Sequence, residues 1–332
     1  MPRLFGPQRA TRPRRERQMI AWCRRNAGSI ADQAAAVLAV YWVVALLIRL
    51  TVRDSFVPAS TIFYATPIIV LAGIAAIACL LLLVRRRRRM GWLCLGAAVA
   101  CMAWWHCATR FTSATASDGK GVRVLAWNTA GRALERPGVI DQIRRVNPDI
   151  IAMNEAGPAT KERIAQYAAA FPGYNISTIY HGMILITRGE LVEHECGDLA
   201  DRAWYKHTSV LVGGVRLSVI QPEIRSNPFY SRAAAIQTLT RLACSMSNEP
   251  TIIIGDFNTP ADSIHLRGLR QDFLNAFEAA GKGHYATWPI PCPVLAIDQA
   301  WVSRLLRVTR CELGWTWKSD HRPLICEIQL AN

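Results

Sequence analysis

The sequence predicts a membrane-spanning helical region followed by a domain of mixed α and β structure. Three long apolar stretches occupy the first third of this 332-residue chain. The remaining two thirds alternate short apolar runs, typical of strands, with segments whose apolar residues follow helical spacing. Several of the strand-like runs form hairpin-like pairs, and this arrangement favours two packed sheets flanked by helices.

The three apolar stretches are residues 34–48, 62–84 and 90–108. A helix needs about 20 mostly apolar residues to cross a bilayer, and the second and third stretches reach that length. The first does so only if it continues past Arg49, whose side chain would then extend to the membrane surface. Helices of a soluble core are apolar on one face, whereas these are apolar all round, so we expect three transmembrane helices.

Basic residues flank these stretches and predict their orientation. Residues 1–108 hold 15 of the 39 Lys and Arg and 3 of the 24 Asp and Glu, which leaves 24 basic and 21 acidic residues elsewhere. The positive-inside rule places the N-terminus and the Arg85–Arg89 block in the cytoplasm. Three spans then place everything after Thr109 outside the cytoplasm. The net charge of +3 in that part does not indicate an extended nucleic-acid-binding surface.

These features divide the chain into four parts. They are a basic cytoplasmic segment (1–32), a three-helix transmembrane region (33–108), a linker (109–121) and a globular domain (122–332). The linker is predicted from its content of Ser, Thr, Ala and Gly. The lipid bilayer is the expected partner of the helices, and no feature of the sequence predicts a protein partner.

Within the globular domain, residues 251–254 form an unbroken apolar run, typical of a strand buried on both faces. Residues 324–330 instead alternate apolar and polar side chains, which indicates a strand with one buried face. The other strand-like runs are 122–128, 148–155, 183–186, 208–212, 215–220 and 296–303. Helical spacing marks residues 138–146, 159–171, 231–246 and 266–280.

Polar side chains stand at the ends of five of these runs. In chain order they are Asn128, Glu155, the pair Asp256 and Asn258, Asp298, and the pair Asp320 and His321. We expect them to meet in one pocket that offers carboxylate and amide oxygens and one imidazole. Oxygen ligands of this kind suit Mg²⁺, Mn²⁺ or Ca²⁺.

In order and spacing, these five pieces resemble the motifs of the endonuclease/exonuclease/phosphatase superfamily. That group includes pancreatic-type deoxyribonucleases, abasic-site endonucleases, inositol-polyphosphate 5-phosphatases and neutral sphingomyelinases. The resemblance covers roughly residues 121–330. It implies a four-layer α/β sandwich and the hydrolysis of a phosphoester with the help of Mg²⁺ or Mn²⁺.

The resemblance implies that Asn128, Glu155 and Asp320 hold the metal ion. Glu155 is the strongest of these predictions, because a carboxylate at the end of an apolar strand is costly to bury unless it is paired or bound to metal. Asn128 would offer its amide oxygen to the metal or to a phosphate, and Asp320 would add a carboxylate.

The same resemblance assigns the catalytic roles to four residues. Asp256 would orient or deprotonate the attacking water, and Asn258 would hold that water or a phosphate oxygen. His321 would donate to the scissile phosphate, and Asp298 would raise the pKa of His321 so that the imidazole stays charged.

Three further residues are expected to contact the substrate. Trp288 lies in a segment, Thr287 to Pro289, that resembles a substrate-side loop of family members. Gln221 stands where many members carry His or Tyr, and glutamine donates a hydrogen bond but cannot act as a general acid near neutral pH. Arg225, or alternatively Tyr230, would substitute for the missing group.

The sequence therefore predicts a membrane-anchored, divalent-metal-dependent phosphoesterase whose globular domain lies outside the cytoplasm. A nucleic acid, a phospholipid and a phosphomonoester all fit as substrates. The alternative is a non-catalytic membrane module that binds a phosphorylated ligand, an interpretation that Gln221 alone favours.

Overall fold

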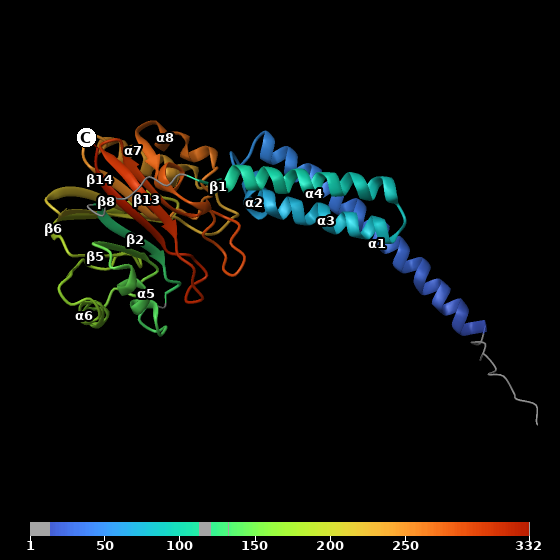
Figure 1. Ribbon diagram of the computed structural model, residues 1–332, viewed down its shortest axis with the longest axis horizontal. Coiled ribbons are helices and arrows are strands. Elements are labelled where there is room, and N and C mark those ends of the chain that lie inside the picture. The colour runs from blue at the N-terminus through green and yellow to red at the C-terminus, as the bar shows by residue number, and fades with distance from the viewer. Residues whose placement is uncertain (1–13, 113–120, 132, 332) are drawn as a thin grey trace, which may run out of the picture.

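The structure is a computed structural model that describes residues 14–112, 121–131 and 133–331. Two six-stranded sheets pack face to face, and helices cover the outer face of each (Figure 1). A bundle of helices extends from one end of this sandwich. The globular domain therefore has the four layers that the resemblance implied.

The first sheet has the strand order β13-β14-β2-β3-β5-β4. Its strands are β2 (Val122–Asn128), β3 (Ile150–Asn154), β4 (Asn175–Ile176), β5 (Ile184–Thr187), β13 (Leu306–Leu313) and β14 (Leu324–Leu330). On β2, Val124 faces the core between the sheets, whereas Leu125 packs against α5 (Val139–Val146) and α6 (Lys161–Ala170). Burial on both faces explains why this strand is almost continuously apolar.

The second sheet has the order β10-β12-β9-β8-β7-β6. Its strands are β6 (Glu190–Ala200), β7 (Ala203–Val212), β8 (Val215–Glu223), β9 (Thr251–Asp256), β10 (Phe273–Asn275) and β12 (Asp298–Ser303). Ile252 and Ile254 of β9 face the core between the sheets, and Ile253 packs against the helical layer. That layer consists of α7 (Ala233–Ser245), η1 (Ile264–Arg267) and α8 (Leu269–Asp272).

The elements of the globular domain differ from the expected ones in two respects. The helix expected at 266–280 is broken, because Phe273–Asn275 leave the helical path to pair with β12, and the Asn275 side chain caps the new helix α9 (Ala276–Ala280). Strands β6 and β13 were not predicted. β6 is a largely exposed edge strand, so it lacks the apolar alternation by which strands are recognised.

Among the residues that the structure describes, two helices, rather than three, are long and apolar enough to cross a membrane: Gly28–Leu50 within α1 (Arg14–Leu50), and α4 (Arg88–Thr109). The second expected span is divided into α2 (Ala59–Ala65) and α3 (Ile68–Val84), which meet at 76°. Pro67 causes the break, because it lacks an amide hydrogen and excludes Thr66 from the helical conformation. The bent pair counts as a third span only if it is taken as one.

Arg49 does not extend to the membrane surface as expected. Its guanidinium is buried and donates to the carbonyl oxygens of Phe63 and Thr66, and it forms an ion pair with Asp262 at 2.9 Å. These carbonyls lie at the end of α2 and have no acceptor role within the helix. Arg49 thus joins α1, α2 and the globular domain.

The structure describes only part of the expected linker. Arg110 and Phe111 form strand β1, which pairs with β11 (Gly283–His284), and residues 113–120 lie outside the described residues. Of the basic segment 1–32, residues 1–13 also lie outside them. The division of the chain into four parts remains a proposal.

A buried lysine links the two sheets. Lys206 on β7 is fully buried, and its Nζ donates to Ser177 Oγ at 2.6 Å and to the Thr178 carbonyl, both just beyond β4. Burial lowers the pKa of Lys206 from 10.5 to about 8. The unfolded chain then binds more protons between these pH values, so the unfolding free energy rises with pH across this window.

We expect Lys206→Met to remove this rise, which amounts to at most about 3 kcal/mol. The melting temperature of the variant minus that of the wild type should therefore be higher at pH 7 than at pH 10, because only at pH 7 does the wild type bury a charged lysine. Lys282→Met, at an exposed lysine, is the matched control and should show no pH-dependent difference. If the melting temperature of Lys206→Met differed from that of the wild type by the same amount at both pH values, the lowered pKa of Lys206 would be contradicted.

Candidate active site

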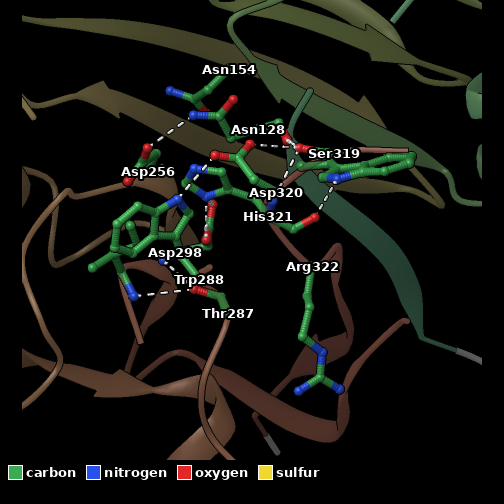
Figure 2. Close-up of polar contacts among 12 residues, drawn as sticks. Asn128, Asn154, Asp256, Thr287, Trp288, Asp298, Ser319, Asp320, His321 and Arg322 are labelled. Atoms are coloured by element: carbon green, nitrogen blue, oxygen red, sulfur yellow. Dashed lines mark hydrogen bonds and ion pairs between the residues drawn. The ribbon is translucent and has the colours of Figure 1, made fainter. Parts of the chain in front are cut away.

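The polar ends of the central strands meet at one edge of the sandwich. Asn128 stands opposite Asn154 in the parallel pair β2 and β3, and Asp256 stands opposite both Asp298 and Glu223 on its two neighbouring strands. Figure 2 shows the side chains that point toward one another there: Asn128, Asp256, Asp298, Asp320 and His321. The structure therefore brings together residues that are almost 200 positions apart in sequence.

His321 and Asp298 form a buried pair. The Nδ1 atom of His321 lies 2.9 Å from Oδ2 of Asp298, and both side chains are nearly inaccessible to solvent. Burial opposes a charge on the imidazole, but the Asp298 carboxylate, aided by Asp256 and Asp320, outweighs it and raises the pKa of His321 to about 10. The imidazole is therefore a cation at neutral pH, and its Nε2–H can donate to a ligand.

Asp256 is the buried carboxylate at the centre of the cluster. It accepts hydrogen bonds from Asn128 Nδ2 at 3.0 Å and from the backbone N–H of Asn258 at 2.7 Å. Burial, followed by the charge of Asp298, raises the pKa of Asp256 to about 7. A carboxylate with such a pKa is suited to take a proton from water near neutral pH.

Two of the expected metal ligands, Glu155 and Asp320, line the same space, and the third, Asn128, contacts Glu155. Asn128 Nδ2 donates to Glu155 Oε1 at 2.9 Å, and the Glu155 side chain is exposed at the end of β3. Asp320 Oδ2 accepts from Trp288 Nε1 at 3.0 Å, so the indole fixes one oxygen of that carboxylate. Trp288 thus lies beside the site through a contact that the sequence did not predict.

Sequence reasoning missed two residues of this cluster, Glu223 and Asn154. Glu223 ends β8 and accepts from Asn154 Nδ2 at 2.7 Å. Burial, followed by the charge of Asp256, raises the pKa of Glu223 to about 8. The signal that identified Glu155, a carboxylate at the end of an apolar strand, also applies to Glu223. However, Gln221 and Pro222 interrupt the apolar run, so the expected strand ends at residue 220, three residues before β8 does.

Gly255 is needed where β9 passes this cluster. A Cβ atom at this position would lie 2.9 Å from Asn154 Oδ1 and 3.1 Å from the Pro222 carbonyl oxygen, closer than side chains approach such atoms. The glycine therefore lets Asn154 reach Glu223 across the strand ends.

The loop before β14 is held by contacts of its own. Ser319 Oγ donates to the Asn128 carbonyl at 2.8 Å, and Trp127 Nε1 donates to the His321 carbonyl at 3.0 Å. Arg322 points away from the cluster and donates to the carbonyls of Ala286, Leu313 and Gly314 (Figure 2). The loop therefore presents Asp320 and His321 while Arg322 secures its base.

The remaining expected residues lie outside the pocket. Gln221 is buried between the sheets, where its Nε2 donates to the Met153 carbonyl at 2.8 Å. Arg225 stacks on the ring of Tyr230, with its guanidinium carbon 3.7 Å from the ring centroid. None of the three lines the cavity described next.

The cluster opens into a cavity of about 450 Å³. The polar side of its lining consists of Glu155, Asp256, Asn258, Trp288, Asp320 and His321. Asn128 and Asp298 support this side from behind, through their contacts with Asp256 and His321. The lining also includes residues of α2 from the helical region.

The residues present fit a hard divalent cation. Asn154 Oδ1 is buried and has no hydrogen-bond partner. Asp256 and Glu223 both have raised pKa values because burial and neighbouring carboxylates disfavour their charges, a situation that a cation would relieve. Asp256, Asp298 and His321 also form a geometric Asp/Asp/His group with ligand atoms within 4.8 Å of one another. Because Asp298 engages Nδ1 of His321, only Nε2 of that imidazole remains for a ligand.

The family comparison matches the part of the chain that builds this site. The sequence model of the Endonuclease/Exonuclease/phosphatase family matches residues 125–321, more than half of the chain. A search of curated proteins returns no significant match.

Solved structures share the fold at low sequence identity. A family protein from Bacteroides thetaiotaomicron is 15% identical, with a TM-score of 0.54, over 64% of this chain and 98% of that one. Humanized D. rerio TDP2 is 15% identical, with a TM-score of 0.52, over 63% and 99%. The human Nocturnin catalytic domain with a bound sulfate anion is 17% identical, with a TM-score of 0.50, over 68% and 99%.

Proposed function

Because the chain belongs to the endonuclease/exonuclease/phosphatase family, whose members are phosphoesterases, we propose that it is a membrane-anchored, divalent-metal-dependent phosphoesterase. The observation that carries this proposal is the convergence of Asp256, the His321–Asp298 pair and Glu155 on one cavity. It joins a base, a hydrogen-bond-donating cation and a carboxylate ligand within reach of one phosphate group.

Each residue has a distinct task in hydrolysis. Asp256 takes a proton from the attacking water, which Asn258 helps to orient, as water adds to phosphorus. His321 donates a hydrogen bond to the phosphoryl oxygens as charge builds up on them, and Asp298 keeps its imidazole charged. The ester P–O bond to the leaving alcohol then breaks, the alcohol oxygen takes up a proton from solvent water, and Asp256 returns its proton to solvent.

Glu155, Asn128 and Asp320 would hold the ion. When bound, Mg²⁺ or Mn²⁺ polarises a phosphoryl oxygen and stabilises the leaving oxygen. Trp288 restrains Asp320 through its indole N–H.

The arrangement of the helices supports a site outside the cytoplasm. The turn between α3 and α4, which contains part of the Arg85–Arg89 block, lies at the end of the bundle away from the sandwich (Figure 1). If basic segments remain in the cytoplasm, the globular domain lies on the other side of the membrane. This topology requires the bent pair α2 and α3 to cross the bilayer once.

No observation favours the non-catalytic alternative. Its support was Gln221, and that residue bonds the Met153 carbonyl between the sheets rather than facing the cavity. The residues that carry the proposed chemistry surround the cavity or contact its lining.

The proposal predicts metal-dependent turnover of a minimal phosphodiester. The full-length protein in detergent should hydrolyse bis-p-nitrophenyl phosphate with Mg²⁺ or Mn²⁺, and EDTA should abolish the release of p-nitrophenolate. Readdition of either ion should restore it. Turnover that is unaffected by EDTA, or no turnover with either ion, would refute the proposed function.

A further inference from the structure

The cavity has a wall that does not come from the globular domain. Thr61, Tyr64 and Ala65 of α2 line it together with the catalytic residues, and we call these three residues the α2 wall. Figure 1 shows α2 at the end of the helical bundle that adjoins the sandwich. A segment some 190 residues before Asp256 thus completes the active site.

Specific contacts fix the α2 wall against the globular domain. Thr61 Oγ1 donates to the Pro228 carbonyl at 2.8 Å. Asp54, between α1 and α2, accepts from Tyr64 OH at 3.0 Å and from the backbone N–H of Ile264 at 3.1 Å. Asp54 is buried, so these bonds are shielded from water and hold α2 in register with the site.

A buried arginine joins the α2 wall to the loop after β8. The guanidinium of Arg232 lies 4.5 Å from the centroid of the Tyr64 ring and donates to the Ser226 carbonyl at 2.9 Å. Arg232 is therefore engaged in holding this junction together. Arg232 also lines the cavity, and its buried Nη1 atom has no hydrogen-bond partner among the described residues, so it can donate to the phosphate of a bound substrate. The α2 wall itself carries no charged side chain, whereas a channel for a nucleic-acid backbone is lined by cations along its length.

The surroundings of the α2 wall match a membrane surface. Phe229 and Tyr230 follow the Pro228 carbonyl that binds Thr61, and their rings are 69% and 49% exposed. Aromatic residues are enriched at the membrane–water interface, where such exposure is favourable. Because α2 lies between the first helix able to cross a membrane and α3, the cavity lies where the bilayer surface would be.

We propose that the α2 wall determines specificity, and that it selects a phosphoester carrying an apolar chain, taken from the bilayer surface. The phosphate would face Glu155, Asp256 and His321, and the apolar part would lie against the α2 wall. This inference rests on the proposed function and names its substrate class. A globular domain produced without α2 would lack this wall.

The test places a bulky side chain in the α2 wall. Ala65 is exposed and ends α2, so Ala65→Trp fills the cavity without disturbing a packed core. Ala76→Trp is the matched control, since Ala76 is an exposed alanine on α3 that does not line the cavity. The probes are vesicles of dioleoyl phosphatidylglycerol and dioleoyl phosphatidate, a single-stranded DNA oligonucleotide, and bis-p-nitrophenyl phosphate, each with full-length protein and Mn²⁺.

We expect the wild type to hydrolyse a vesicle lipid faster than DNA, as measured by mass spectrometry of the products. In Ala65→Trp, the ratio of lipid turnover to bis-p-nitrophenyl phosphate turnover should fall by about tenfold or more, while Ala76→Trp should keep the wild-type ratio. Equal losses of lipid hydrolysis and of bis-p-nitrophenyl phosphate turnover in Ala65→Trp would overturn this inference alone. So would faster hydrolysis of DNA than of lipid by the wild type. The lack of turnover on every probe would overturn the proposed function, and this inference with it.

Discussion

Replacing Asp256 by Asn will lower kcat on bis-p-nitrophenyl phosphate by about 1,000-fold, since the variant cannot accept a proton from the attacking water. The substitution keeps the shape of the side chain. It removes the repulsion between Asp256 and Asp298, but it also places an amide where Asn128 and Asn258 donate hydrogen bonds. These effects on stability oppose each other, so the melting temperature should change little while the activity is lost.

The control for Asp256→Asn is Asp198→Asn, at an exposed aspartate on β6. This variant should retain wild-type kcat and melting temperature. A kcat of Asp256→Asn close to the wild-type value would show that another group activates the water, and Glu223 would then be the next residue to test.

His321→Asn is expected to reduce kcat by about 100-fold to 1,000-fold, because it removes the cation that donates to the phosphoryl oxygens. The asparagine amide can still donate to the buried Asp298 carboxylate, which lies 2.9 Å from the imidazole in the wild type. Asp298 is thus not left as an unpaired buried charge, and the domain should fold. Single-turnover measurement of p-nitrophenolate release at saturating Mn²⁺ separates this loss from weaker metal binding.

His194→Asn, at an exposed histidine on β6, is the matched control for His321→Asn. If saturating Mn²⁺ restored the rate of His321→Asn to that of the wild type, the role of His321 would be to bind metal. The geometric Asp/Asp/His group would then be the metal site, in place of Glu155 and Asn128.

Most of the central strands could be predicted because they are buried on both faces. The apolar runs of β2 and β9 have few alternatives to a sheet core, and the polar residues that end them stand out against those runs. The same reasoning failed for β6, whose exposed side chains have no apolar pattern, and for residues 266–280, where pairing with β12 overrides the helical spacing.

Which polar side chains line the cavity was harder to predict, because a side chain at a strand end faces either the cavity or the core. Gln221 lies two residues before Glu223 on β8, yet it bonds the Met153 carbonyl between the sheets, while Glu223 contacts Asn154 in the site. Likewise, Arg225 stacks on Tyr230 instead of lining the cavity. These outcomes depend on neighbouring strands that sequence spacing does not specify.

The sequence by itself determined the family, the order of the polar strand ends and the presence of long apolar helices, since each is encoded in a contiguous segment. Only the tertiary structure decided what those segments form together. It paired Asp298 with His321, added Glu223 and Asn154 to the site, and placed α2 in the lining of the same cavity as Asp256. The physical reason is that such contacts depend on strand register and on the break at Pro67, which bring distant residues together.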